Sequence, residues 1–210
     1  VIIVGTGSGL SYASLGPTHH SMADMAVLRT LPDMTIFSPC DPLQVRKGLR
    51  AAYEHDGPVY IRLGKKGEPV LDNENDVILG RSVQMMEGSD ICIVATGSVL
   101  SLALNAANSL KNENISARVE NFHTIKPLDR EKLDELADKF ETLVVVEEHG
   151  IIGGLYGAIA EYYIEKNSRP RVIGIGAHDT FLHEIGGHNF ARKFYGITEE
   201  NIINKCKQLF

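Results

Sequence analysis

The sequence predicts an α/β protein made of two three-layer units with mainly parallel sheets. Short β-branched runs alternate with stretches of helical apolar periodicity along most of the 210 residues. Such alternation implies parallel strands joined by crossover helices. A charged stretch rich in turn-forming residues, 64–80, interrupts the alternation and separates two series. We therefore expect a first unit over residues 1–66, a linker over 67–87 and a second unit over 88–210.

The first series begins with "VIIVG", a β-branched run ended by glycine that predicts a buried strand. A loop rich in glycine and serine follows, and then a short helical face that ends at Pro32. Asp41 followed by Pro42 is typical of a helix start, with an N-cap and a proline at the first helical position. Strands are expected at 1–5, 34–39 and 58–63, and helices at 22–28 and 42–53.

The second series repeats the alternation. Ser98 is expected to open one helix, and Thr198 is expected to cap the last one. The run "TLVVVEE" is so uniformly apolar that its strand should be covered on both faces. Strands are expected at 91–96, 115–121, 142–148 and 171–176, and helices at 98–107, 133–140, 153–166 and after 198.

The composition excludes several classes of protein. With 43% hydrophobic and 23% charged residues, the chain is an ordinary globular protein. A net charge of -6 argues against nucleic acid or an anionic membrane as the main partner. No signal peptide or membrane-spanning run is visible, and the scattered cysteines suggest reduced thiols, so we expect a cytoplasmic location. These cysteines are Cys40, Cys92 and Cys206.

The motif "GPTHH", residues 16–20, is the most informative junction. It places His19 and His20 between a glycine-rich loop and a helical stretch. In parallel α/β sheets, ligands meet such loops at the carboxyl ends of strands. The pair could be a catalytic edge, a metal site or a solvated turn. The preceding glycines lack both the Walker lysine and the GxGxxG spacing, so a nucleotide site is not favoured.

No metal site is expected elsewhere. His178, His183 and His188 recur every five residues, a spacing that does not align ligands on one helix face. Glu147, Glu148 and the neighbouring His149 end one strand just before a helix, and we expect them to serve a structural purpose.

The chain resembles the transketolase family over almost its whole length. "GPTHH", "LRTLPDMTIFSPCDP" and "DGPVYIRL" are similar to that family's pyrimidine-binding domain. "HTIKPLD", "VVVEEHGIIGGLYGAIAE" and "YGITEENI" are similar to its C-terminal domain. The first motif most resembles the small subunits of split transketolases. The resemblance implies a truncated pyrimidine-binding domain followed by a transketolase C-terminal domain.

The resemblance also implies a reaction, the transfer of a two-carbon ketol unit between sugars or sugar phosphates. His19 stands where the family has the catalytic histidine that faces the substrate. His20 replaces a common glutamine and is a candidate substrate-binding residue. Lys65 stands at the family's phosphate-binding arginine, with Arg62 as a second candidate.

Two departures from the family pattern suggest a relative with altered substrate choice. Leu15 replaces an acidic residue, and Gly7 stands where the family has a histidine. Alternatives from the same cofactor class are 1-deoxyxylulose-phosphate synthase and the beta subunit of a 2-oxoacid dehydrogenase. An alternative from another class is a non-catalytic dimerisation module.

The resemblance implies thiamine diphosphate and Mg²⁺ as cofactors, bound mainly by residues outside this sequence. The chain begins in mid-strand without methionine, so we expect a piece of a longer polypeptide or a split subunit that is inactive alone. The expected partners are a second copy and an N-terminal subunit or domain that binds thiamine diphosphate.

Overall fold

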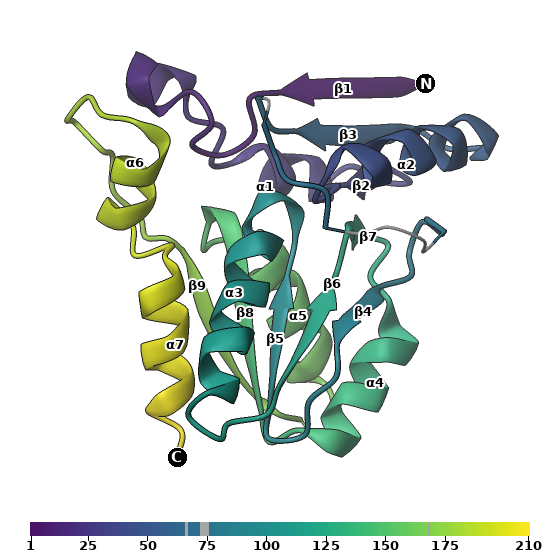
Figure 1. Cartoon of the computed structure of the whole chain (residues 1–210). Helices are drawn as coiled ribbons and strands as arrows, with labels where there is room; N and C mark the ends of the chain where they lie inside the picture. The colour runs from purple at the N-terminus through teal and green to yellow at the C-terminus, as the bar shows by residue number, and fades with distance from the viewer. Residues whose placement is uncertain (66, 72–75, 168) are drawn as a thin grey trace.

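The computed structural model describes residues 1–65, 67–71, 76–167 and 169–210 (Figure 1). It contains two mixed, mainly parallel sheets, one with the strand order β1-β3-β2-β7 and the other with the order β4-β6-β5-β8-β9. Helices cover both sheets, which confirms the predicted α/β class.

The first sheet takes strands from both halves of the sequence. Its parallel strands are β1 (Ile2–Thr6), β2 (Thr35–Phe37) and β3 (Val59–Leu63). The fourth strand, β7 (Thr124–Lys126), was not predicted and pairs antiparallel with β2. The two expected units therefore share a sheet.

Helix α2 (Pro42–Glu54) covers one face of the first sheet, where Ala52 packs with Phe37 and Val59. Its start confirms the predicted cap, because Asp41 Oδ1 accepts a hydrogen bond from the Gln44 N–H over 2.7 Å. The shorter α1 (Asp24–Arg29) lies on the opposite face. The prediction that the first strand is buried was wrong, since β1 lies at the sheet edge.

The second sheet begins inside the range expected as a linker. Strand β4 (Val83–Met86) pairs antiparallel with β6, and its register shifts after Gln84. This short, irregular strand carries no alternating pattern from which it could be predicted. The other strands are parallel, namely β5 (Ile91–Ala95), β6 (Ala117–Asn121), β8 (Thr142–Gly150) and β9 (Arg171–Ala177).

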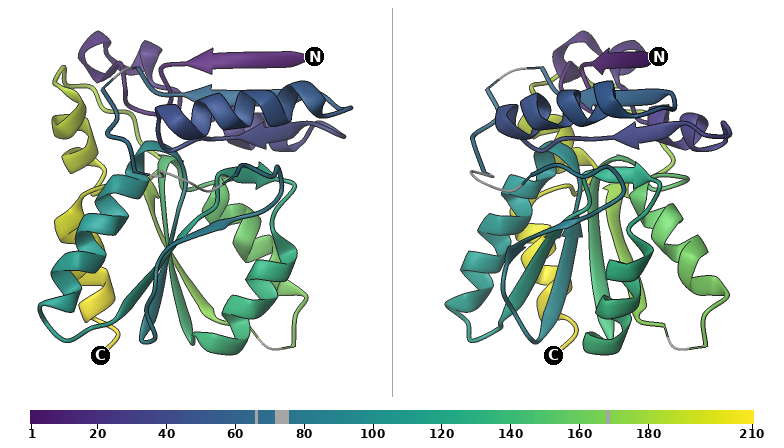
Figure 2. Two further views of the ribbon diagram at one scale, coloured as in Figure 1. Left: turned by 45° about the vertical axis from the view of Figure 1, so that its right-hand side comes forward. Right: turned by 90° about the vertical axis from the view of Figure 1, so that its right-hand side faces the viewer.

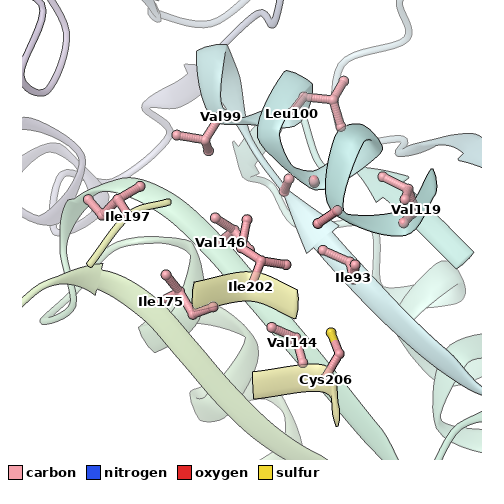
Figure 3. Packing of buried hydrophobic residues seen from close by; sticks show 14 of the residues in the cluster. Ile93, Val99, Leu100, Val119, Val144, Val146, Ile175, Ile197, Ile202 and Cys206 are labelled. Atoms are coloured by element: carbon pink, nitrogen blue, oxygen red, sulfur yellow. The ribbon is translucent and has the colours of Figure 1, made fainter. Parts of the chain in front are cut away.

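Helices cover both faces of the second sheet (Figure 2). One face carries α3 (Leu100–Lys111) and α7 (Glu199–Lys207), and the other carries α4 (Arg130–Lys139) and α5 (Leu155–Ile164). On the first face, Val144 and Val146 of β8 point toward Ile202 of α7 (Figure 3). On the other face, Val145 packs with the α4 and α5 cluster. The prediction that β8 is covered on both sides is confirmed.

In the second series two helix starts were predicted from caps, and one of them differs from expectation. Ser98 lies in a 3-10 turn, and α3 begins at Leu100, because the Ser98 hydroxyl accepts a hydrogen bond from Arg192 rather than capping the helix. Thr198 caps α7 as predicted. Helix α6 (His188–Phe194) was missed, because it is only two turns long and gave no periodic signal.

Among the helices in the described ranges, none has the length and apolar character that a bilayer span requires. Cys40, Cys92 and Cys206 are buried thiols.

Candidate functional site

The carboxyl ends of strands from both sheets converge on one cavity. Its volume is about 270 Å³, and we call it the carboxyl-edge cavity. Polar loops that follow β1, β2, β3 and β5 line it. They include Ser8, Ser38, Asp41, Lys65 and Ser98. Because ligands of parallel α/β proteins bind at this edge of the sheet, the cavity is a candidate binding site.

The loop that follows β1 is fixed to the second sheet. Gly9 has a φ of +57°, and a Cβ there would lie 2.6 Å from the Glu148 carbonyl oxygen, so only glycine allows this approach. The next residue, Leu10, donates its backbone N–H to Glu148 Oε1 over 2.8 Å. Gly9 and Ser21 also bond to each other through their backbones. The two ends of the histidine-bearing loop are therefore held together and against β8.

The two adjacent histidines have different surroundings. His19 ends a 3-10 turn (Pro17–His19) and is exposed, with its Nδ1 3.1 Å from the Thr18 hydroxyl. His20 is half-buried and lines a different cavity of about 640 Å³, together with Asp24. Within the described structure, its Nε2 is buried without a hydrogen-bond partner. The imidazole of His19 is thus accessible from solvent, whereas His20 faces the junction between the two sheets.

The two candidate cations also differ. Arg62 is buried, and its Nε donates to Asp24 Oδ2 over 2.7 Å. Its Nη2 donates to the carbonyl oxygens of Ser21 and Glu148. Lys65 is exposed and lines the carboxyl-edge cavity, and its Nζ lies 5.0 Å from the centre of the Tyr12 ring. Arg62 joins the loop to both sheets, while Lys65 presents its ammonium group to the cavity.

Tyr12 is a residue that sequence reasoning missed. A Cβ at Gly7 would lie 2.2 Å from Tyr12 Cε2, so the tyrosine ring lies directly against the glycine. The ring of Tyr12, five residues further along the loop, therefore fills the space that a side chain at position 7 would occupy. The absence of a side chain at Gly7 was the available signal, but nothing in the local pattern indicated which residue covers it.

Glu147 and Glu148 are buried, and each is held by hydrogen bonds within the protein. Glu147 accepts the backbone N–H groups of Leu155 and Tyr156 at the start of α5, at 2.7 and 3.0 Å. Its burial outweighs these bonds and raises its pKa to about 7. Burial would raise the pKa of Glu148 too, but the bond from His188 and the charge of Arg192 hold that pKa below its usual value.

His149 lies at the same junction. Its Nε2 is 3.7 Å from Asp24 Oδ1, and burial, together with the charge of Arg62, lowers its pKa to about 4. The pKa of Asp24 is also lowered. Burial opposes that shift, but the charge and hydrogen bond of Arg62 outweigh it. His149 is therefore neutral near pH 7 and belongs to a structural network.

The donor groups do not fit a metal-bound diphosphate. In the part of the chain that the structure describes, no cluster of three or more His, Cys, Asp or Glu side chains could hold a metal ion. Two carboxylates, Asp41 and Glu68, line the carboxyl-edge cavity, and Asp41 already accepts hydrogen bonds from the N–H groups of Gln44 and Leu71.

The fold and its polar loops define an α/β protein with a candidate binding site where two sheets meet. Residues 1–68 match the transketolase pyrimidine binding domain, and residues 80–202 match the transketolase C-terminal domain. The chain therefore belongs to the transketolase family.

Two relatives are named as transketolase subunits. The chain is 38% identical to an apulose-4-phosphate transketolase subunit of Phocaeicola vulgatus and covers 65% of its length, with 99% of this chain aligned. It is 36% identical to the 6-deoxy-6-sulfo-D-fructose transketolase subunit SqwH of a Clostridium species, again covering 65% of that protein and 100% of this chain. The chain thus spans about two thirds of the length of these relatives.

Solved structures give the same family and fold. A protein described as a split gene transketolase, inactive beta4 tetramer, is similar with a TM-score of 0.90 and 36% identity, over 99% of this chain and 66% of that one. The transketolase of Campylobacter jejuni shares the fold with a TM-score of 0.75 at 16% identity, over 99% of this chain and 31% of that one.

Proposed function

We propose that this chain is part of a two-subunit transketolase that moves a two-carbon ketol unit between sugars with an anionic end group. The likeness to two transketolase subunits supports this reaction, since one is named for a sugar phosphate and the other for a sulfonated sugar. The observation that carries the proposal is the exposed imidazole of His19 on the loop that follows β1.

His19 serves as the substrate-facing acid–base group. The donor ketose loses its C2–C3 bond, and a new carbon–carbon bond forms to the aldehyde carbon of the acceptor. The donor's C3 hydroxyl gives up its proton as it becomes an aldehyde, and the acceptor's aldehyde oxygen gains one. An imidazole is suited to holding and returning such a proton near neutral pH. His20 lines the other cavity and contributes to substrate binding only indirectly, through the loop that it shares with His19.

Lys65 binds the anionic end of the sugar, a role supported by its exposure at the carboxyl-edge cavity. A bound tail fixes the reacting end of the sugar near His19. Lys65 supplies a point charge rather than the two-pronged contact of arginine, which allows different tetrahedral anions to bind. Arg62 contributes indirectly, because it holds the loop that carries the histidines.

Thiamine diphosphate and Mg²⁺ would be bound mainly by residues outside this chain, because no cluster of metal-ligating side chains is found among the described residues. A partner chain that binds the cofactor is therefore part of the proposal, as is a second copy of this chain. The cofactor supplies the carbon–carbon chemistry when it is bound.

The test is reconstitution. The native partner is captured from its own cell extract on the tagged full-length protein, and the complex is assayed with a ketose phosphate and an aldose phosphate. We expect ketol transfer that requires thiamine diphosphate, Mg²⁺ and both chains. An intact complex without cofactor-dependent turnover would support the non-catalytic dimerisation module instead.

A second candidate is a 1-deoxyxylulose-phosphate synthase. The chain is 39% identical over 193 residues to that enzyme of Dictyoglomus turgidum, covering 31% of its length. The same complex distinguishes the two reactions, because a synthase condenses pyruvate with the aldose phosphate and releases CO₂. Carbon dioxide released from pyruvate only when the aldose phosphate is present would favour the synthase. Release that needs no sugar would favour the dehydrogenase beta subunit.

A further inference from the structure

Glu148, near the end of β8, lies against the base of the loop that carries His19. We call residues 9–21 the histidine loop. A Cβ at Gly9 would lie 2.6 Å from the carbonyl oxygen of Glu148 and also 2.6 Å from its Oε1. The backbone of the histidine loop therefore packs directly against both the main chain and the side chain of this glutamate.

Glu148 contributes to holding both ends of the histidine loop. At the start of the loop, the Leu10 N–H donates to Glu148 Oε1 over 2.8 Å. At the end of the loop, Arg62 Nη2 donates to the carbonyl oxygens of Ser21 and Glu148, at 2.9 and 3.0 Å. His19 lies between these ends and is exposed, so the position of its ring depends on how the loop backbone is held.

Helix α6 fixes the carboxylate of Glu148 from the opposite side. Arg192 Nε donates to Glu148 Oε2, and His188 Nε2 lies 2.9 Å from each carboxylate oxygen. Arg192 is itself fixed, because its Nη2 donates to the Ser98 hydroxyl over 3.1 Å. The carboxylate, in a side chain that is only 3% exposed, thus joins α6 to the histidine loop.

This junction requires an ionised carboxylate. Burial would raise the pKa of Glu148, but the bond from His188 and the charge of Arg192 lower it, so both oxygens can accept hydrogen bonds. Oε1 accepts the Leu10 N–H, and Oε2 accepts the N–H of Arg192. A glutamine would point its NH₂ group at one of these two donors. Either the histidine loop or α6 would then lose its contact.

We propose that Glu148 is a positioning residue of the reaction, which holds the histidine loop so that the His19 imidazole stays directed at the substrate. This inference rests on the proposed function, in which His19 moves the substrate's proton. A displacement of about 1 Å at a reacting group can cost about 10²-fold in rate. Helix α6, about 170 residues after His19, thereby acts on catalysis through one buried carboxylate. Glu148 has this role in addition to the structural purpose expected from the sequence.

Two adjacent glutamates provide a matched pair of variants for kinetics of the assembled enzyme. Glu147 is buried on the same strand and also accepts two backbone N–H groups, but these belong to the start of α5. Glu148→Gln should lower kcat about 10–100-fold with KM within about threefold of wild type, whereas Glu147→Gln should keep kcat within about twofold. Equal kcat in the two variants, with assembly and thermal melts unchanged, overturns the proposal.

Arg192 gives a second pair that leaves Glu148 in place. Arg192→Met removes the partner that α6 supplies to the carboxylate, and kcat should fall about tenfold. Arg192→Lys keeps a positive charge there, so it should restore most of kcat. Equal kcat in these two variants contradicts positioning through the carboxylate, also in the case that Glu148→Gln does not fold.

Hydrogen–deuterium exchange of the full-length chain tests the contact without turnover. In Glu148→Gln, peptides that contain Leu10 should exchange about tenfold faster than in wild type, and in Glu147→Gln they should not change. Unchanged exchange in folded Glu148→Gln overturns the proposal. If the wild-type complex shows no ketol transfer, the proposed function fails, and the exchange result still decides whether Glu148 holds the histidine loop.

Discussion

Strands β1 and β8 have similar sequences and very different surroundings. Both are apolar and β-branched, and both were predicted to be buried. The β8 residues from Leu143 to Val146 are 0% exposed, whereas Ile3 and Val4 of β1 are 44% and 50% exposed. β8 has a strand on each side and helices on both faces, while β1, among the strands of the described residues, pairs only with β3. An apolar run therefore predicts a strand, but the place of that strand in the sheet decides its burial.

The end of β8 differs further from β1, because ionisable side chains are buried there as well. Glu147 has a raised pKa, about 7, and His149 has a lowered pKa, about 4. The folded state therefore favours protonated Glu147, and its contribution to stability is lost as pH rises from about 4.5 to 7. The folded state favours neutral His149, and its contribution is lost as pH falls from about 6.5 to 4. The two dependences oppose each other in wild type.

We expect single substitutions to separate the pH dependence that Glu147 causes from the one that His149 causes. Relative to wild type, Glu147→Gln should gain up to about 3 kcal/mol in unfolding free energy as pH rises from 4.5 to 7. His149→Gln should change in the opposite direction between pH 4 and 6.5. Urea denaturation at a series of pH values measures both. If the unfolding free energies of wild type and both variants changed with pH in the same way, Glu147 and His149 would not be buried as the structure shows.

A matched pair of valines tests the comparison through packing. Val146 of β8 is 0% exposed and Val4 of β1 is 50% exposed. Val146→Ala should lower the unfolding free energy by about 2 kcal/mol, because it removes two buried methyl groups and leaves a small cavity. Val4→Ala should change it by about 0.5 kcal/mol or less. Equal losses in the two variants would mean that β1 is as well packed as β8.

The helix caps of the two regions give the smallest effect. Asp41 caps α2 beside the first sheet and also accepts the Leu71 N–H over 2.7 Å, whereas Thr198 caps α7 beside the second. Thr198→Ala should cost about 1 kcal/mol, and Asp41→Ala somewhat more, because a second backbone donor loses its partner. Thermal unfolding measures both. A larger loss for Thr198→Ala would contradict the assigned contacts of Asp41.

Much of the fold could be predicted because local signals agreed with it. The Asp41-Pro42 helix start, the Thr198 cap and the uniform β8 run each depend on neighbouring residues alone. Strands β4 and β7 and helix α6 were missed because each is short and is stabilised by distant partners. β7, for example, exists through its pairing with β2, almost ninety residues earlier in the chain.

The candidate site shows the same limit. The motif "GPTHH" indicated His19 and His20, and β3 with the segment after it indicated Arg62 and Lys65. Sequence could not show that Arg62 turns inward to Asp24, or that Tyr12 covers Gly7. The contact between His188 and Glu148 joins residues 40 positions apart, and no spacing rule predicts it.

The turnover of the reconstituted two-chain complex carrying His19→Ala tests the central claim most directly. The claim is that His19 is the group that faces the substrate and moves its proton. We predict a kcat lower by about 10²–10⁴-fold, with unchanged assembly and melting temperature, while the His183→Ala control keeps wild-type turnover. A His19→Ala complex with kcat within about twofold of wild type would contradict the account.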